Sequence, residues 1–233
     1  MLPGLRTPMH FVGEPGVPPP IYVGTHETIG TELSDYSRPN DVRQAIAGDV
    51  AIVGVDERTP NPGTTTQYPQ ASSGWTALYE TLGTDYGGNV RFKYWSRIVQ
   101  ASNETVTITN PGMTYECQLG IVVASFRVVS ATTVTRVAGG TTLGASLQTG
   151  TFSKHANAKM YYALVHENLY PKSPSFSPPA PTGWTLVRIC PWYNAAQYMA
   201  LPDAVSGAAI TWTGLDPEPS YPYRMSVQIF EVR

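Results

Sequence analysis

The sequence is poor in charge. Only 14% of its 233 residues are Asp, Glu, Lys or Arg, well below the usual quarter, and the formal net charge is −2. No basic cluster is longer than two residues, so the electrostatic footprint of a nucleic-acid-binding protein is missing. No apolar run approaches the length of a membrane-spanning helix. We therefore expect neither nucleic-acid binding nor membrane insertion.

Residue patterns that carry catalysis or bind metals are also missing. The four histidines are not spaced as metal ligands, and no phosphate-binding loop, calcium loop or nucleophile elbow occurs. Asp56-Glu57 and His166-Glu167 fall at matching strand ends. Adjacent side chains of a strand point to opposite faces, so neither pair converges on one substrate. We predict no enzymatic activity, no catalytic or metal site and no cofactor.

Cysteine is scarce, and a signal sequence is not evident. Cys117 and Cys190 fall in dissimilar contexts, which favours two separate buried thiols, with a disulfide as the alternative. The amino terminus lacks a positive cap followed by an apolar run, so we expect no signal peptide. Residues 1–20 are rich in Pro and Gly and end in Pro18, Pro19 and Pro20. This composition predicts an extended arm.

Turn-forming and β-forming residues are plentiful. Gly and Pro occur 21 times each, and they separate short runs that are rich in Val, Ile, Thr, Tyr and Trp. In the run VRFKYWSRIV, Arg91, Lys93 and Trp95 alternate with Phe92 and Tyr94, which predicts a strand with one solvated face. The fold class is therefore predicted to be all-β.

The same order of elements occurs twice along the chain. Gly-Trp-Thr at 74–76 recurs 109 residues later at 183–185, and Phe92 matches Tyr198 at an offset of 106. Small steps between such offsets are what changes in loop length produce in a duplicated unit.

We predict two tandem antiparallel β-sandwich units, jelly-roll-like and related by internal duplication, over residues 21–130 and 131–233. One larger sandwich with a core shared by both halves is the alternative.

The repeated tryptophans have two interpretations. Trp75 and Trp184 each follow a glycine and begin a strand, where an indole ring can cover one end of the core. They could alternatively be platforms on which sugar rings stack.

The long loops have a similar ambiguity, between solvated connections and binding surfaces built from Tyr, Ser and Pro on a rigid scaffold. The candidate partner or glycan contacts in these loops and their surroundings are Tyr68, Tyr170, Phe176, Tyr221 and Tyr223.

A resemblance follows from the order of these motifs. Gly48-Asp49 precedes an apolar strand, a Pro-rich loop, Gly74-Trp75-Thr76, the aromatic strand 92–95 and a last apolar strand at 121–128. This order resembles the minor tail proteins of tailed phages of actinobacteria, which are mycobacteriophage-like. The second half departs from the pattern, because Asn157-Ala158-Lys159 stands in place of Gly-Asp.

The resemblance implies a non-enzymatic structural component of the virion, in the tail or tail tip rather than the head, that serves assembly or contact with the host surface. Its partners would be other virion proteins, copies of itself in a trimer or higher ring, and a cell-surface glycan. The chain would be made in the host cytoplasm, and the arm would anchor it on a neighbouring subunit, becoming ordered only there. The alternatives are a capsid decoration protein and a carbohydrate-binding module for cell-wall glycans.

Overall fold

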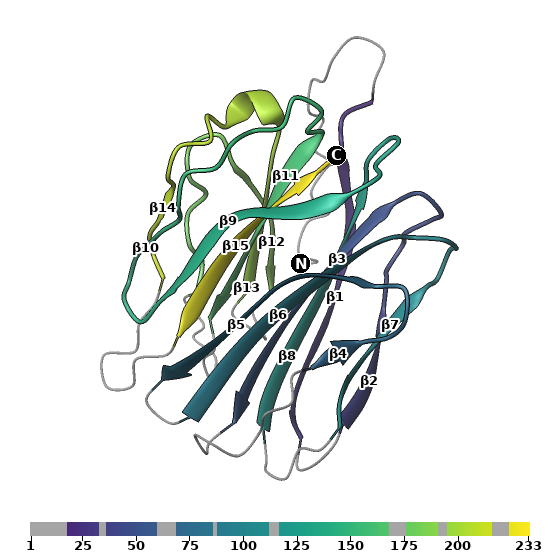
Figure 1. Cartoon of the computed structure of the whole chain (residues 1–233), viewed down its shortest axis with the longest axis vertical. Coiled ribbons are helices and arrows are strands. Elements are labelled where there is room, and N and C mark those ends of the chain that lie inside the picture. Colours follow the sequence, from purple (N-terminus) through teal and green to yellow (C-terminus); the bar gives the residue numbers. More distant parts are fainter. Residues whose placement is uncertain are drawn as a thin grey trace, which may run out of the picture.

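Figure 1 shows a computed structural model of the chain, which describes residues 18–32, 36–59, 69–85, 88–111, 117–167, 176–190, 195–215 and 224–233. Within these ranges the regular elements are β-strands and one short 3₁₀ turn, η1 (Pro202–Ala204). The prediction of an all-β protein is confirmed. Ten strands form two five-stranded antiparallel sheets, and five shorter strands form two small sheets.

The first large sheet is built by strands of the amino-terminal half. Its order is β1 (Ile21–Glu32), β8 (Cys117–Arg127), β3 (Val50–Thr59), β6 (Gly88–Ile98) and β5 (Thr76–Asp85). A small sheet lies on its outer face, in the order β2 (Tyr36–Asp41), β7 (Thr105–Asn110) and β4 (Gln70–Ala71). The long strands are rich in β-branched and aromatic residues, which suit the pleated surface of a sheet.

The second large sheet is built by strands of the carboxyl-terminal half. Its order is β9 (Val134–Thr142), β15 (Met225–Val232), β11 (Met160–Glu167), β13 (Ala195–Ala200) and β12 (Thr185–Cys190). The second small sheet consists of β10 (Leu147–Gln148) and β14 (Thr211–Trp212) and packs on the outer side of this sheet.

The two large sheets have the same strand order, because β9, β15, β11, β13 and β12 occupy the places of β1, β8, β3, β6 and β5. Their irregularities also match. The register shifts at Leu78 on β5 and at Val187 on β12, in each case three residues after the tryptophan of Gly-Trp-Thr. A second matched shift lies at Val23 on β1 and at Val137 on β9. Since a bulge increases the local twist, both sheets are distorted at equivalent places.

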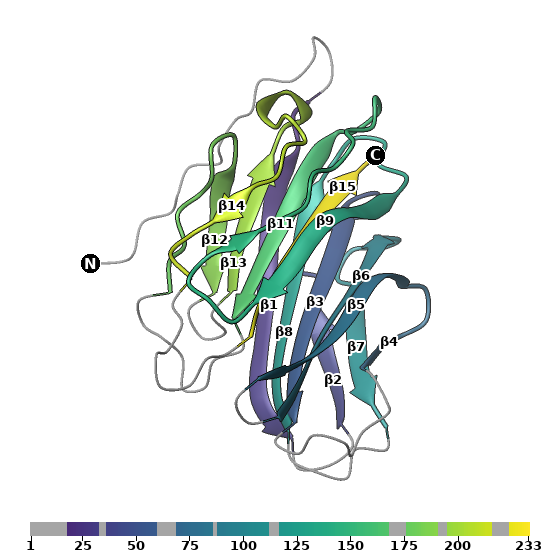
Figure 2. The same cartoon turned by 60° about the vertical axis from the view of Figure 1, so that its left-hand side comes forward.

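The inner faces of the two large sheets pack against each other (Figure 2). The edge strand β1 lies against β12, and the edge strand β5 lies against β9. Because β1 matches β9 and β5 matches β12, each of these two contacts is the counterpart of the other. This is the arrangement of a two-fold, isologous interface.

Three hydrophobic clusters fill the layers. The central cluster lies between the large sheets and combines Phe92, Tyr94 and Phe126 of the first half with Tyr162 and Phe230 of the second. Each half also has an outer cluster, between its large sheet and the segments on the outer face of that sheet. Separate cores and a shared core therefore coexist, whereas the sequence left them as alternatives. The predicted unit boundary near residue 130 stays a prediction.

The expectation of a solvated face on β6 is wrong. Arg91, Lys93 and Trp95 do share a face, but their exposed fractions are only 2%, 7% and 3%. Both cations are neutralised in ion pairs, Arg91 with Glu57 at 3.0 Å and Lys93 with Glu80 at 3.1 Å. Pairing offsets part of the free-energy cost of removing a charge from water. The two cations of β6 could therefore be buried, although their alternation in the sequence had predicted a solvated face.

The molecule has two different ends. The strands β1 and β9 begin, and β8 and β15 end, at the upper end in Figure 1, and segments next to all four line one common cavity there. The strands β1, β3, β5, β11 and β12 end at the opposite, lower end.

Candidate functional site

A groove of about 820 Å³ lies at the upper end of the molecule, and we call it the terminal groove. This volume lies within the roughly 300–1,000 Å³ that is typical of ligand sites. Its lining comes from five separate parts of the chain, namely residues 18–20, 128–130 with 132–133, 155–159, 201–203 and Arg233.

Two lysines hold the walls of the terminal groove through backbone carbonyls. Lys159 Nζ donates to the carbonyl oxygens of Val129 and Ser130, both at 2.6 Å. Lys154 Nζ donates to the carbonyl oxygen of Pro202 at 2.8 Å. Hydrogen bonds with an ionised donor are about twice as strong as neutral ones. The walls are therefore fixed relative to each other.

The floor forms where β15 meets the segment that leads into β9. The backbone N–H of Arg233 donates to the carbonyl of Thr133 at 3.0 Å, and that of Thr132 donates to the carbonyl of Arg233 at 2.6 Å. The Arg233 guanidinium pairs with Glu231 at 3.2 Å, and the hydroxyl of Tyr161 donates to the same carboxylate at 2.8 Å. Burial, together with this carboxylate, raises the pKa of Tyr161. These charged groups thus support the groove.

The accessible surface of the terminal groove is mixed. Val129 is 44% exposed there, and Leu201 and Pro202 are half-buried. His155 and Asp203 are exposed and add polar groups to the same lining. Apolar contact beside hydrogen-bonding groups suits an extended peptide or another amphipathic ligand.

The predicted anchoring residues Pro18, Pro19 and Pro20 form one wall of this groove. Pro20 is buried, Pro19 is half-buried and Pro18 is exposed, so burial decreases away from β1. The three prolines contact the body of their own chain. The remainder of the predicted arm, residues 1–17, lies outside the described residues.

Of the predicted aromatic contacts, the structure describes only Phe176. Phe176 is only 3% exposed and belongs to the outer cluster of the second half, so it offers no surface to a partner or a glycan, contrary to the expectation. Its segment is held on the sheet by Tyr198, whose hydroxyl donates to the carbonyl of Pro178 at 2.6 Å. The other candidates lie outside the described residues: Tyr68, Tyr170, Tyr221 and Tyr223.

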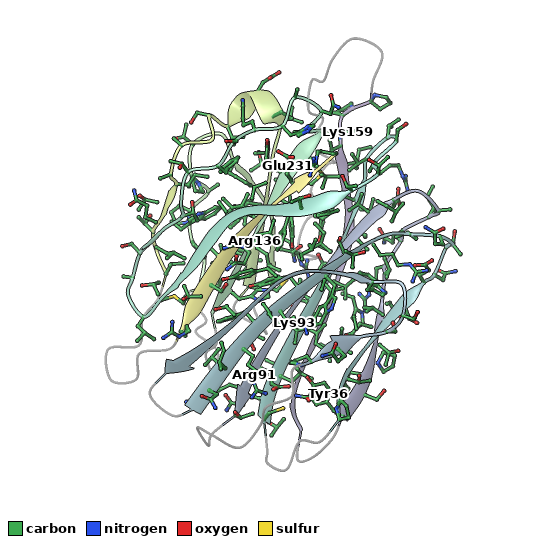
Figure 3. The ribbon with its side chains drawn as sticks, in the orientation of Figure 1. Tyr36, Arg91, Lys93, Arg136, Lys159 and Glu231 are labelled. Carbon is green, nitrogen blue, oxygen red and sulfur yellow. The ribbon has the colours of Figure 1, made fainter. Side chains whose placement is uncertain are left out.

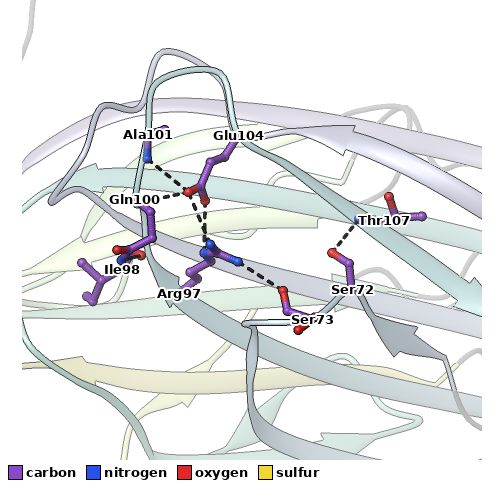
Figure 4. Close-up of polar contacts among 8 residues, drawn as sticks. All are labelled: Ser72, Ser73, Arg97, Ile98, Gln100, Ala101, Glu104 and Thr107. Atoms are coloured by element: carbon purple, nitrogen blue, oxygen red, sulfur yellow. Dashed lines mark hydrogen bonds and ion pairs between the residues drawn. The ribbon is translucent and has the colours of Figure 1, made fainter.

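The first Gly-Trp-Thr turn is held by a polar cluster, shown in Figure 4. Arg97 donates to the carbonyl of Ser73 at 3.2 Å and pairs with Glu104 at 3.1 Å. Glu104 also accepts the backbone N–H of Gln100 at 2.7 Å. Gly74 has φ +87°, and a Cβ there would meet the Arg97 guanidinium. Glycine therefore allows both the turn and the close approach of Arg97.

The second Gly-Trp-Thr turn is closed by backbone instead. Gly183 has φ +83°, and a Cβ there would run into the carbonyl oxygen of Ala204, at the end of η1. Trp184 is 6% exposed and lies edge-on to Trp212, with ring centroids 5.7 Å apart. Its counterpart Trp75 is half-buried beside the outer cluster of the first half. Trp184 covers the end of a core, and its burial excludes sugar stacking on it.

A buried polar cluster at the lower end was missed by sequence reasoning. Glu57 is fully buried and accepts hydrogen bonds from Arg91 Nη1 at 3.0 Å, the hydroxyl of Tyr36 at 2.8 Å and Asn110 Nδ2 at 2.7 Å. Figure 3 labels Tyr36 and Arg91 at this end and Lys159 and Glu231 at the other. The three donors come from three different strands, so no local spacing signals the cluster.

His166 lies between the two large sheets, whereas Glu57 lies between the first large sheet and its small sheet. It is fully buried near the rings of Tyr94 and Phe92, with centroid distances of 5.7 and 6.2 Å. Burial lowers the pKa of His166 to about 3, so the imidazole is neutral at physiological pH.

The remaining expectations about chemistry concern metals and thiols. Over the described ranges, no group of three or more His, Cys, Asp or Glu side chains could hold a metal ion. Cys117 and Cys190 are free, buried thiols in different clusters, which confirms the predicted separate thiols. Among the residues that the structure describes, no helix is long and apolar enough to span a membrane.

Comparison with known proteins adds no identification. No protein-family model, curated protein or solved structure matches the chain. The interpretation of the terminal groove and of the lower end therefore depends on their own geometry.

Proposed function

We propose that this chain is a non-enzymatic structural component of a tailed-phage virion, most compatible with a minor tail or tail-tip protein that serves assembly or contact with the host. The observation that supports it is the polarity of the molecule. The upper end carries the terminal groove and Pro18–Pro20, while strands of both halves end at the lower end. Rigid sheets that present loops at one end are a common scaffold for recognition, and the other end is then free for attachment.

We further propose that the two halves are jelly-roll-like units related by internal duplication. The identical strand order, the matched shifts at Leu78 and Val187, and the matched shifts at Val23 and Val137 support this relation. Fusion of two copies of an isologous dimer would produce the reciprocal contacts of β1 with β12 and β5 with β9. The proposed ancestor is thus a single sandwich that paired through its large sheet.

The state of the buried charges also supports a structural role. Glu57 and Arg91 neutralise each other inside the protein, and the buried Asp49 pairs with the exposed Arg127 at 3.1 Å. Charged groups held in such contacts serve the packing of the fold.

Fractionation of particles tests the virion assignment. Heads and tails would be separated and each fraction analysed for this chain by quantitative mass spectrometry. We expect the chain in tails, in a fixed number of copies per particle. Recovery only with heads would support the decoration alternative, and absence from purified particles would refute the proposal.

A glycan-binding module is the alternative of a different class. Over the described residues the exposed large hydrophobic side chains are all aliphatic: Ile29, Ile46, Leu82, Val129 and Leu143. They provide no aromatic platform for stacking on a sugar ring. Calorimetric titration of the chain with purified cell-wall polysaccharide distinguishes the two readings. Saturable binding would favour the glycan module. The absence of a binding signal, together with incorporation of the chain into tails, would favour the structural role.

A further inference from the structure

We propose that the terminal groove is the docking site of the chain's own amino-terminal segment, residues 1–17. The inference depends on the proposed function only in treating this segment as an arm. It concerns where the arm is held before a neighbouring subunit is met. The test uses the purified chain alone. A negative result would therefore refute docking without bearing on whether the protein is found in tails.

The position of Pro18–Pro20 is the first argument. These residues form one wall of the groove, and the exposed Pro18 directly follows residue 17, the last residue of the segment. A ligand that is tethered at the rim of its site has an effective concentration in the millimolar range for a short flexible link. Even a weak intrinsic affinity then fills the groove.

The sequence of the segment supplies the second argument. Glu14-Pro15-Gly16-Val17 has proline and glycine at the central positions of a type II turn, a pattern that reverses the chain direction. A reversal there would bring Phe11 and Val12 back alongside Pro18–Pro20. These two residues are the largest adjacent apolar pair within reach of such a turn.

The lining of the groove complements them. Val129, Leu201 and Pro202 contribute apolar surface to the lining that includes Pro18–Pro20, and Val129 is 44% exposed there. Docking of Phe11 and Val12 would remove this surface from water, which is favourable at about 25 cal/mol per Å² of apolar area. The lysine-held walls keep the groove preformed, so docking does not have to order them.

Limited chymotrypsin digestion of the full chain tests the proposal, because chymotrypsin cleaves after Phe11. Release of the fragment 1–11 would be followed by mass spectrometry, with a synthetic peptide of residues 1–20 as the unprotected reference. We expect the chain to release this fragment at least tenfold more slowly than the peptide. We expect Val129→Asp to remove most of this difference, because a loss of about 1.4 kcal/mol in docking is a tenfold change in population.

Leu82→Asp is the matched control. Leu82 is 51% exposed and lies on β5, outside the groove lining, so the same change of charge and polarity there should leave the cleavage rate unaltered. Melting temperatures of both variants would establish that each remains folded. Equal cleavage of the chain and the peptide, or an equal effect of the two substitutions, would overturn the proposal.

Protein concentration identifies the chain that provides the arm. Protection within one chain is independent of dilution, which is the expected result. Protection that disappears on dilution would mean that the groove binds the segment of a second copy, and it would overturn docking within one chain.

Discussion

The two halves of the molecule differ most in how they stabilise the outer faces of their large sheets. The first half buries paired charges, such as Arg91 with Glu57, on the outer face of β6. The second half places aromatic rings there, and Tyr198, Trp184 and Trp212 pack within its outer cluster. Yet strand order and bulge positions coincide. The arrangement of the backbone therefore tolerates two different chemistries, provided that each layer is filled.

The largest effect should come from the paired charges of the first half. We expect Glu57→Ala to lower the free energy of unfolding by about 3–5 kcal/mol, because it leaves the Arg91 guanidinium buried without its carboxylate. Urea denaturation followed by tryptophan fluorescence would measure the loss.

Two controls accompany this change. Replacement of both partners, Glu57→Leu with Arg91→Leu, should recover much of the stability, since an apolar pair needs no charge compensation. Glu80→Ala, which removes the half-exposed partner of the buried Lys93, should cost less than Glu57→Ala, because the Glu80 carboxylate is partly solvated and contributes less to the pair. A loss for Glu80→Ala as large as that for Glu57→Ala would contradict the assigned difference in burial.

The corresponding change in the second half is Trp184→Ala. We expect a loss of about 3 kcal/mol, because the ring is 6% exposed and its removal leaves a cavity beside Trp212. Trp75→Ala at the matched, half-buried position should cost less than half as much. Equal losses at the two positions, measured by the same denaturation, would show that the two turns are energetically equivalent.

The matched glycines provide a sharper comparison. Gly183→Ala should cost roughly 2–3 kcal/mol, because it combines an unfavourable positive φ with a collision against the backbone carbonyl of Ala204. Gly74→Ala has the same φ penalty but meets only the Arg97 side chain, which can move, so about 1 kcal/mol is expected. Thermal unfolding of both variants would be compared, and a larger loss at Gly74 would contradict this reading.

A smaller effect should appear as acid sensitivity of the central core, which belongs to both halves. The pKa of His166 is lowered to about 3 by burial, below its ordinary 6.5, so the unfolded chain binds a proton first as the pH falls. The contribution of the neutral His166 ring to the free energy of unfolding is fully present above pH 6.5, and it decreases as the pH falls towards 3. Between pH 7.5 and 5 the loss is about 2 kcal/mol.

His166→Phe should remove this part of the pH dependence, since the aromatic neighbours Phe92 and Tyr94 accept another ring. Denaturation at pH 7.5 and pH 5 would compare the variant with the original chain. An unchanged pH slope would assign the acid sensitivity to other groups.

Sequence reasoning correctly found several of the long strands but not all of their faces. It matched Phe92 with Tyr198 across the repeat, yet Phe92 lies in the central cluster and Tyr198 in an outer one. An odd shift of register moves a side chain to the opposite face of a strand. Loop lengths that differ between the two halves change the offset of equivalent strands, and a misalignment by an odd number of residues is not visible in short identities.

The candidate site was predictable only in part. The three prolines were singled out by composition, and they do line the terminal groove. The other walls, around Val129, Lys159 and Leu201, come from segments far apart in the chain that carry no motif. The Glu57 cluster was hidden for the same reason, because its donors belong to other strands.

The sequence by itself determined the all-β class, the alternation along β6 and the two glycine-tryptophan turns, since each depends on the conformational preferences of a few neighbouring residues. The tertiary structure decided which face of each strand is buried, which charges are paired and where the groove opens. Burial depends on which distant strands become neighbours. In this chain the small sheet on the outer face of the first large sheet buries the charged side of β6, and the packing of the two halves brings five separate segments together around the terminal groove.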